Sequence, residues 1–343
     1  MELWLGENNA PIKNEGASIM NIIKYFCTIW GNFKANIRIL GKFNLEHTLH
    51  DLQQTNTSIL HDLNICKKNL IDLYYEFHQE EKVQVQDELD FIKECGQIET
   101  FPYPQIKKIQ HNIVVDFDKR LQLPFVIHKD KRLYFAKEFT IESAKAAYIN
   151  YVERENLLGG GYTAKAPHQY ITDSFHVEQN DIVVDAGCAE ALFALDSVEK
   201  AKHIYLLEAD AIWHKPLQAT FAPFKDKVTI IQKFLSGENF GNAVTLDGLF
   251  DKFSEESFFI KMDIEGAEES VIQGNKKFLT SQNKIKLACC TYHRAHHAEM
   301  LSSLLKDMGY IFEFSDGYML FPWDEHQQPP YFRKGLIRAV RSI

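Results

Sequence analysis

Four short segments carry acidic or imidazole side chains directly after apolar runs that are typical of strands. The first is VVDAGCAEA, in which Asp185 and Gly187 follow the apolar residues. The second, IYLLEAD, reaches Glu208, and the third, FFIKMDIEGAE, contains Asp263. The fourth is LACCTYHR, with His293 near its end. Carboxylates and an imidazole at such points can bind a polar ligand or transfer a proton.

The elements that position these segments alternate between strand and helix from residue 181 onward. Apolar runs predict strands at 182–185, 203–207, 227–231, 258–262 and 285–291. Amphipathic stretches predict helices at about 190–199, 211–220, 266–279 and 296–308. This alternation is typical of a parallel sheet covered by helices, and ligands bind beyond the carboxyl ends of its strands.

The C-terminal part departs from this alternation. YIFEF, SDG and YMLF predict a hairpin that adds an antiparallel strand to the sheet. The tail FRKGLIRAVR is basic and amphipathic, which favours a solvated helix. Contact of this tail with an anionic acceptor or a membrane surface is the alternative.

Residues 45–77 show apolar residues in alternating steps of four and three, the spacing of a coiled-coil seam. The pattern predicts a homodimer through residues 45–77, or a helical hairpin within one chain that uses the same seam. A single Asn in such a seam can fix the register and a two-stranded state. The seam consists of Leu45, Leu49, Leu52, Asn56, Ile59, Leu63, Cys66, Leu70, Leu73 and Phe77.

The region between these parts is mixed. FVIHKDKRLYF predicts two short strands around a turn, and IESAKAAYINYVEREN predicts a helix. Gly159–Gly161 then indicate either an interdomain linker or a mobile flap over a ligand.

Composition narrows the class of protein. The 343 residues are 45% hydrophobic and 25% charged, as in ordinary globular proteins, and the net charge of −9 argues against a nucleic-acid partner. The six cysteines form no CxxC pair, which favours reduced thiols. We find no transmembrane segment or signal peptide in the sequence and expect a cytoplasmic protein.

The loop after the first predicted strand discriminates between cofactors. Ala189 and Leu192 stand where the dinucleotide motif G-x-G-x-x-G would place its second and third glycines after Gly187. Ala189 would crowd a diphosphate, so a nicotinamide oxidoreductase is disfavoured. S-adenosylmethionine needs only one tight turn and a distant acid. Glu208 can accept hydrogen bonds from its ribose, and its carboxylate can lie near the first helix N-terminus.

VVDAGCAEALFAL, IYLLEAD, AVTLDGLF and FIKMDIEGAEESVIQGN together resemble the FkbM-type S-adenosylmethionine-dependent methyltransferases. The resemblance spans roughly residues 168–321, and Lys261–Glu268 is its most specific part. It implies a Rossmann-like class I methyltransferase fold that methylates a hydroxyl of a sugar, glycan or secondary metabolite. Family members usually have a glycine where Ala191 stands. This departure favours the alternative, a catalytically degenerate binding or scaffold protein that acts through its N-terminal helices.

We therefore predict four regions. Residues 1–100 are helical, 101–175 form a connecting α+β segment, 176–325 form the methyltransferase domain, and 326–343 form a basic tail.

The predicted site has a donor part and an acceptor part. His293 is the predicted base that takes the proton of the acceptor, with Asp263 orienting it or binding the amino group of the cofactor. Trp213 and Phe234 are aromatic candidates for adenine stacking or for the core. The predicted cofactor-binding residues are Asp185, Gly187, Ala189, Glu208, Phe234 and Asp263.

A divalent metal is an alternative at the same strand ends. Asp263, Glu265 and His293 offer oxygen and nitrogen ligands, and His293 and His297 are four residues apart. The sequence does not fix the spacing of these ligands in space, so no metal ligand is assigned.

Overall fold

A computed structural model describes residues 62–104, 113–152, 166–251, 255–281, 284–322, 324 and 327–341. The chain divides into two compact units, Met1–Leu70 with Pro322–Gln327 and Ile71–Phe321 with Gln328–Ile343. Every predicted site residue belongs to the second unit. Among the described residues, no helix is both long enough and apolar enough to cross a bilayer.

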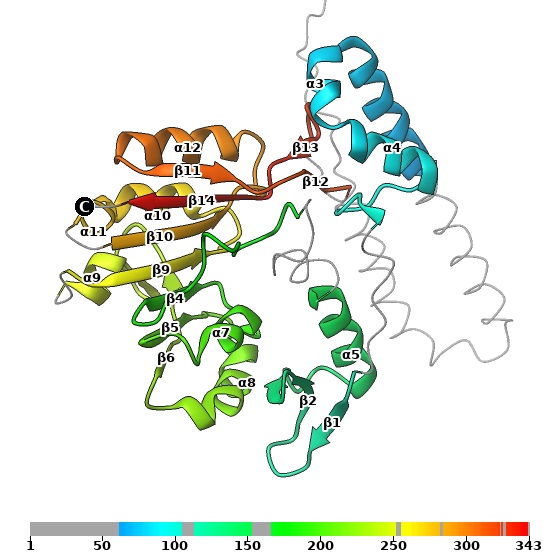
Figure 1. Cartoon of the computed structure of the whole chain (residues 1–343). Coiled ribbons are helices and arrows are strands. Elements are labelled where there is room, and N and C mark those ends of the chain that lie inside the picture. The colour runs from blue at the N-terminus through cyan, green and yellow to red at the C-terminus, as the bar shows by residue number, and fades with distance from the viewer. Residues whose placement is uncertain are drawn as a thin grey trace, which may run out of the picture. The chain divides into compact units, whose positions relative to one another are not determined.

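The second unit contains a seven-stranded sheet with the order β11–β14–β10–β9–β4–β5–β6 (Figure 1). Strands β10, β9, β4, β5 and β6 are parallel, whereas β14 runs antiparallel to both of its neighbours. The predicted Rossmann-like, mostly parallel sheet is therefore confirmed. Its strands are β4 (Ile182–Ala186), β5 (His203–Leu207), β6 (Val228–Ile231), β9 (Ser257–Met262), β10 (Lys284–Cys290), β11 (Ile311–Phe314) and β14 (Leu336–Arg341).

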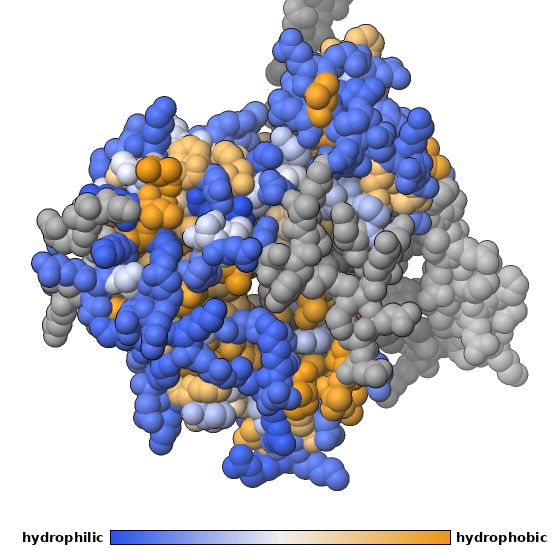
Figure 2. Space-filling model, viewed as in Figure 1, coloured by the Kyte–Doolittle hydropathy of each residue, from blue (hydrophilic) through white to orange (hydrophobic). Residues whose placement is uncertain are grey.

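Helices cover both faces of this sheet because successive strand residues point to opposite faces. Val183 packs in one core with α5 (Ile141–Asn150), α7 (Leu192–Ser197) and α8 (Ala211–Phe221). Ile182 and Val184 pack in the other core. That second core includes α9 (Leu246–Phe250), α10 (Glu268–Gly274), α11 (Lys276–Leu279) and α12 (His297–Asp307). The visible surface of the described residues is mostly hydrophilic, with apolar patches between (Figure 2).

The antiparallel strand comes from a different segment than predicted. Strand β11 does not pair with β12 (Met319–Leu320), so the predicted hairpin is wrong. Instead β11 pairs with β14, and β12 pairs with β13 (Phe332–Arg333).

Strand β14 lies in the segment that the sequence predicts as a solvated basic helix, so that prediction is also wrong. The prediction assumed that the arginines of this segment are solvated, but Arg338 is buried and paired. Its Nε lies 2.9 Å from Glu313 Oε1, and its Nη1 donates to the carbonyl of Gln169. Leu336, Ile337 and Ala339 are fully buried, which stabilises the strand between β10 and β11.

The segment before the sheet follows the prediction closely. Strands β2 (Leu123–His128) and β3 (Lys131–Tyr134) form the expected pair, and β1 (Val115–Asp118) adds a third strand. Helix α5 begins after Thr140, whose hydroxyl accepts from the Ser143 N–H in a capping box. Gly159–Gly161 lie outside the described residues.

Small elements complete the described part of the second unit. Helices α3 (Gln79–Gln84) and α4 (Gln86–Cys95) precede β1, and the 3₁₀ helix η3 (Ala222–Phe224) follows α8. Strands β7 (Phe234–Leu235) and β8 (Ala243–Val244) form a two-stranded parallel sheet.

Part of the predicted seam lies outside the described residues, namely Leu45, Leu49, Leu52, Asn56 and Ile59. Residues 62–77 are helical, but Leu73 and Phe77 of the seam are exposed. Ile71 and Tyr75 face the core instead and pack in one cluster with Leu89 of α4. The described hairpin therefore uses another face than the seam, and the homodimer stays a prediction.

Candidate active site

The loop after β4 has a backbone conformation that normally requires glycine. Gly187 has φ of 68°, and a Cβ there would lie 1.9 Å from the backbone oxygen of Asp263. Ala189 and Ala191 also have positive φ, 45° and 62°. The backbone of the loop thus has the positive φ angles that glycine normally adopts, although Gly187 is its only glycine. Ala189 and Ala191 are each held in a left-handed conformation.

Glu208 fixes this loop from the end of β5. Its Oε2 accepts from the Ala189 N–H at 2.9 Å, and its Oε1 accepts from the Asp210 N–H at 2.8 Å. The carboxylate is half-buried. The predicted acid therefore lies beside the predicted loop, where it can also receive hydroxyl donors of a ligand.

A pocket opens beside the loop. Gly187, Ala189 and Asp263 line it, together with the side chains of Tyr170 and Phe193. The charged residues of its lining are three carboxylates and one ammonium, from Asp185, Glu190, Asp263 and Lys261. An excess of carboxylate favours a cationic ligand over a diphosphate.

Lys261 and Asp185 form a buried ion pair under the loop. Their Nζ and Oδ1 atoms lie 3.1 Å apart, and Nζ also donates to the carbonyl of Gly187 at 2.8 Å. Burial lowers the pKa of Lys261, but the carboxylates of Asp185 and Asp263 outweigh burial and raise it above its usual value. The lysine is therefore charged and ties β9 to the loop.

Asp263 is the centre of a polar network at the end of β9. Tyr170 donates to its Oδ2 and Tyr292 donates to its Oδ1, both at 2.9 Å. Burial raises the pKa of Asp263, but His168, His293 and Lys261 outweigh it and hold the pKa well below the usual range. Asp263 is thus a stable carboxylate on the wall of the pocket.

His293 lies between two carboxylates. Its Nε2 is 3.3 Å from Oδ1 of Asp263, and its Nδ1 is 3.0 Å from Oε1 of Glu268. Burial lowers the pKa of His293, but the two carboxylates outweigh it and raise the pKa to about 9. The predicted proximity of His293 and Asp263 is thus observed, while the base role of His293 stays a prediction.

Three other predicted residues, Phe234, Trp213 and Glu265, do not line the pocket. Phe234 on β7 is 62% exposed and does not line the pocket. Trp213 is buried in the core against Phe135 and Phe139, as in the core alternative. The Glu265 side chain is 94% exposed, but its Oε2 lies 3.8 Å from Nε2 of His293.

Sequence reasoning gave no role to His168, Tyr170, Lys261 or Glu268. A role for Lys261 could have been predicted from the sequence, because a charged residue inside the apolar strand FFIKM needs a buried partner. His168 and Tyr170 precede β4 and carry no motif, so only the fold brings them to the pocket.

Residues 149–312 match the family model described as the methyltransferase FkbM domain. The chain therefore contains an FkbM methyltransferase domain, and the resemblance found in the sequence is confirmed. A domain of this family on this fold is a methyltransferase domain, for which S-adenosylmethionine is the methyl donor. No curated protein sequence matches the chain.

Several solved methyltransferases are distantly similar to the chain. The precorrin-6y C5,15-methyltransferase from Geobacter metallireducens GS-15 is 18% identical, with a TM-score of 0.34, over 49% of this chain and 83% of that one. Trm5b from Pyrococcus abyssi is 14% identical, with a TM-score of 0.30, over 68% of this chain and 56% of that one. An rRNA methylase from Streptococcus thermophilus is 10% identical, with a TM-score of 0.30, over 55% of this chain and 93% of that one. Such distant likenesses carry no information about the substrate.

Ala191→Gly should cost less stability than Ala194→Gly. Both alanines are buried, but Ala191 is left-handed and Ala194 lies inside α7. Relief of the left-handed strain is worth about 1–2 kcal/mol, whereas glycine inside a helix costs about 1 kcal/mol. Denaturant unfolding measures both variants. Equal losses of stability would contradict the strain at Ala191.

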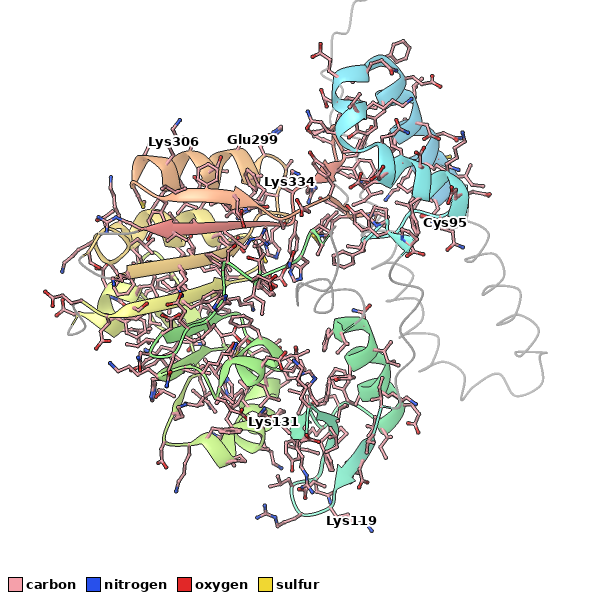
Figure 3. All side chains as sticks on the ribbon, viewed as in Figure 1. Cys95, Lys119, Lys131, Glu299, Lys306 and Lys334 are labelled. Carbon is pink, nitrogen blue, oxygen red and sulfur yellow. The ribbon has the colours of Figure 1, made fainter. Side chains whose placement is uncertain are left out.

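Glu208→Ala should weaken S-adenosylmethionine binding by about 10- to 100-fold, because it removes a charged hydrogen-bond acceptor beside the loop. Calorimetry measures the dissociation constant. Glu299→Ala is the control, since Glu299 lies on α12 and points away from the sheet (Figure 3). An unchanged constant in the Glu208 variant would exclude this residue from the donor site.

Proposed function

We propose that the domain transfers the methyl group of S-adenosylmethionine to a hydroxyl of a sugar, glycan or secondary metabolite. The observation that carries the proposal is the pocket beside the glycine-type loop, with three carboxylates and one ammonium in its lining. S-adenosylmethionine carries a sulfonium and an ammonium, so this charge fits it better than a dinucleotide with two phosphates.

The residues present fit this donor. When bound, S-adenosylmethionine supplies an electrophilic methyl group. Glu208 would hold the ribose, and Asp185, Gly187 and Ala189 would shape the pocket for the methionine part. Phe234 is the proposed adenine contact, because it is a large exposed apolar side chain soon after the end of β6. Since Phe234 does not line the pocket, the adenine would have to extend beyond the pocket lining to reach it.

The acceptor would lie at Asp263. This carboxylate already accepts from the hydroxyls of Tyr170 and Tyr292, so the same wall offers hydrogen-bonding partners to a hydroxyl acceptor. We assign proton transfer from the acceptor to His293, which Asp263 holds in place. Because the pKa of His293 is raised to about 9, only its neutral form accepts the proton, so turnover should rise with pH up to about 9. Alignment of acceptor and methyl group would supply much of the remaining acceleration.

Donor binding discriminates this function from its alternatives. Calorimetry with S-adenosylmethionine and its demethylated product should give heat for both ligands. Absence of heat for both would support the scaffold alternative. Protection from thermal unfolding by NAD in preference to S-adenosylmethionine would support an oxidoreductase.

His293→Ala should leave donor binding unchanged and lower turnover by about 100-fold or more, the usual contribution of a general base. Turnover requires an acceptor, which a screen of glycans and metabolites with labelled methyl donor would supply. His296→Ala is the matched control, because His296 is exposed and lies near His293 in the chain. Unchanged turnover in the His293 variant would remove this histidine from the mechanism.

A further inference from the structure

Asp263, Glu268 and His293 form a cluster, named here the acid–imidazole cluster, from three separate elements. Asp263 follows β9, Glu268 is the first residue of α10, and His293 follows β10. The Glu268 side chain is fully buried, that of His293 is 7% exposed, and that of Asp263 is 21% exposed. The imidazole pairs with both acids, so the buried cluster sets two carboxylates against one imidazolium and keeps an excess of one negative charge.

The spacing of the cluster suits a metal ion. One carboxylate oxygen of Asp263, one of Glu268 and one ring nitrogen of His293 all lie within 4.8 Å of one another. Opposite ligands of an octahedral ion lie about 4.2 Å apart, twice a bond of about 2.1 Å. A slight closing of the cluster would therefore bring its three atoms to ligand distance.

Several buried polar atoms at the cluster form no hydrogen bond. They include Oε2 of Glu268 and both ring nitrogens of His297. The two ring nitrogens of His293, in contrast, face Asp263 and Glu268 in ion pairs. Oε1 of Glu268 accepts from the Ile264 N–H, which explains the position of one oxygen only. Unpaired buried polar atoms are rare in native proteins, and an ion or a water beside Oε2 of Glu268 would satisfy it.

His297, the first residue of α12, lies behind Glu268. Its Nδ1 is 3.9 Å from Oε2 of Glu268, its side chain is fully buried, and neither ring nitrogen forms a hydrogen bond. From this position the His297 side chain can hold the carboxylate of Glu268 in place.

We propose that Asp263, Glu268 and His293 bind a divalent cation of the Mn²⁺ class. Two carboxylates suit Mn²⁺, Mg²⁺ and Ca²⁺, and the imidazole favours a first-row transition ion among these. The absence of a thiolate in the cluster disfavours soft ions. Glu268 thus takes the place that the sequence alternative gave to Glu265.

Binding of the cation does not depend on the proposed function, but a catalytic role would rest on it. Asp263 belongs both to the cluster and to the pocket wall. A cation held there would lower the pKa of an acceptor hydroxyl and stabilise its oxygen. The proton would then pass to solvent, because His293 as a ligand could not also accept it.

Mn²⁺ binding to the chelator-treated full-length protein tests the proposal. Electron paramagnetic resonance titration with Mn²⁺ alone should show one site per chain. Glu268→Gln and Asp263→Asn should each weaken it at least tenfold, and His293→Ala should do the same. Glu299→Gln should leave the affinity unchanged, because this carboxylate is exposed and pairs with His296 outside the cluster.

Thermal unfolding provides the second measurement and controls for misfolding. Mn²⁺ should raise the melting temperature of the wild type and of Glu299→Gln, but not of Glu268→Gln. If one cluster variant fails to fold, the other two decide the result. Absence of Mn²⁺ binding by the wild type, equal affinity in the folded cluster variants, or binding of Zn²⁺ without Mn²⁺ would overturn the proposal. None of these measurements requires a methyl donor or acceptor.

Discussion

The close approach of the β4 loop to the end of β9 is the constraint on which the candidate site depends. The space at Gly187 is closed by the backbone of Asp263, so the loop can pass only without a side chain. Lys261 adds the electrostatic part, because its buried ammonium joins Asp185 to the carbonyl of Gly187. These contacts place the loop and the carboxylate of Asp263 on the wall of one pocket.

Much of the fold could be predicted from the sequence because its parallel strands are continuous apolar runs. The predicted strands from residue 182 to 291 match β4, β5, β6, β9 and β10 within one or two residues. The prediction failed at β14, since a strand with two arginines resembles a solvated tail. Only tertiary structure supplies Glu313 as the partner that lets Arg338 be buried.

The candidate site was predictable where strand ends carry acids and not where the fold supplies distant partners. Glu208 and Asp263 lie where the alternation of strand and helix placed them. Tyr170 reaches Asp263 from a segment whose local sequence gives no such signal. Glu268 lies in the specific segment Lys261–Glu268, but only the fold brings it to His293. The number of glycines in the loop did not predict its backbone conformation, because Ala189 and Ala191 adopt the positive φ angles of glycine.

A crystal structure of the protein with S-adenosylmethionine is the most direct test of the account. The account predicts the sulfonium nucleoside in the pocket lined by Gly187 and Ala189, with its ribose at Glu208 and its methyl group facing Asp263. A diphosphate of a dinucleotide bound beside Ala189, or a methyl donor bound away from this loop, would contradict it.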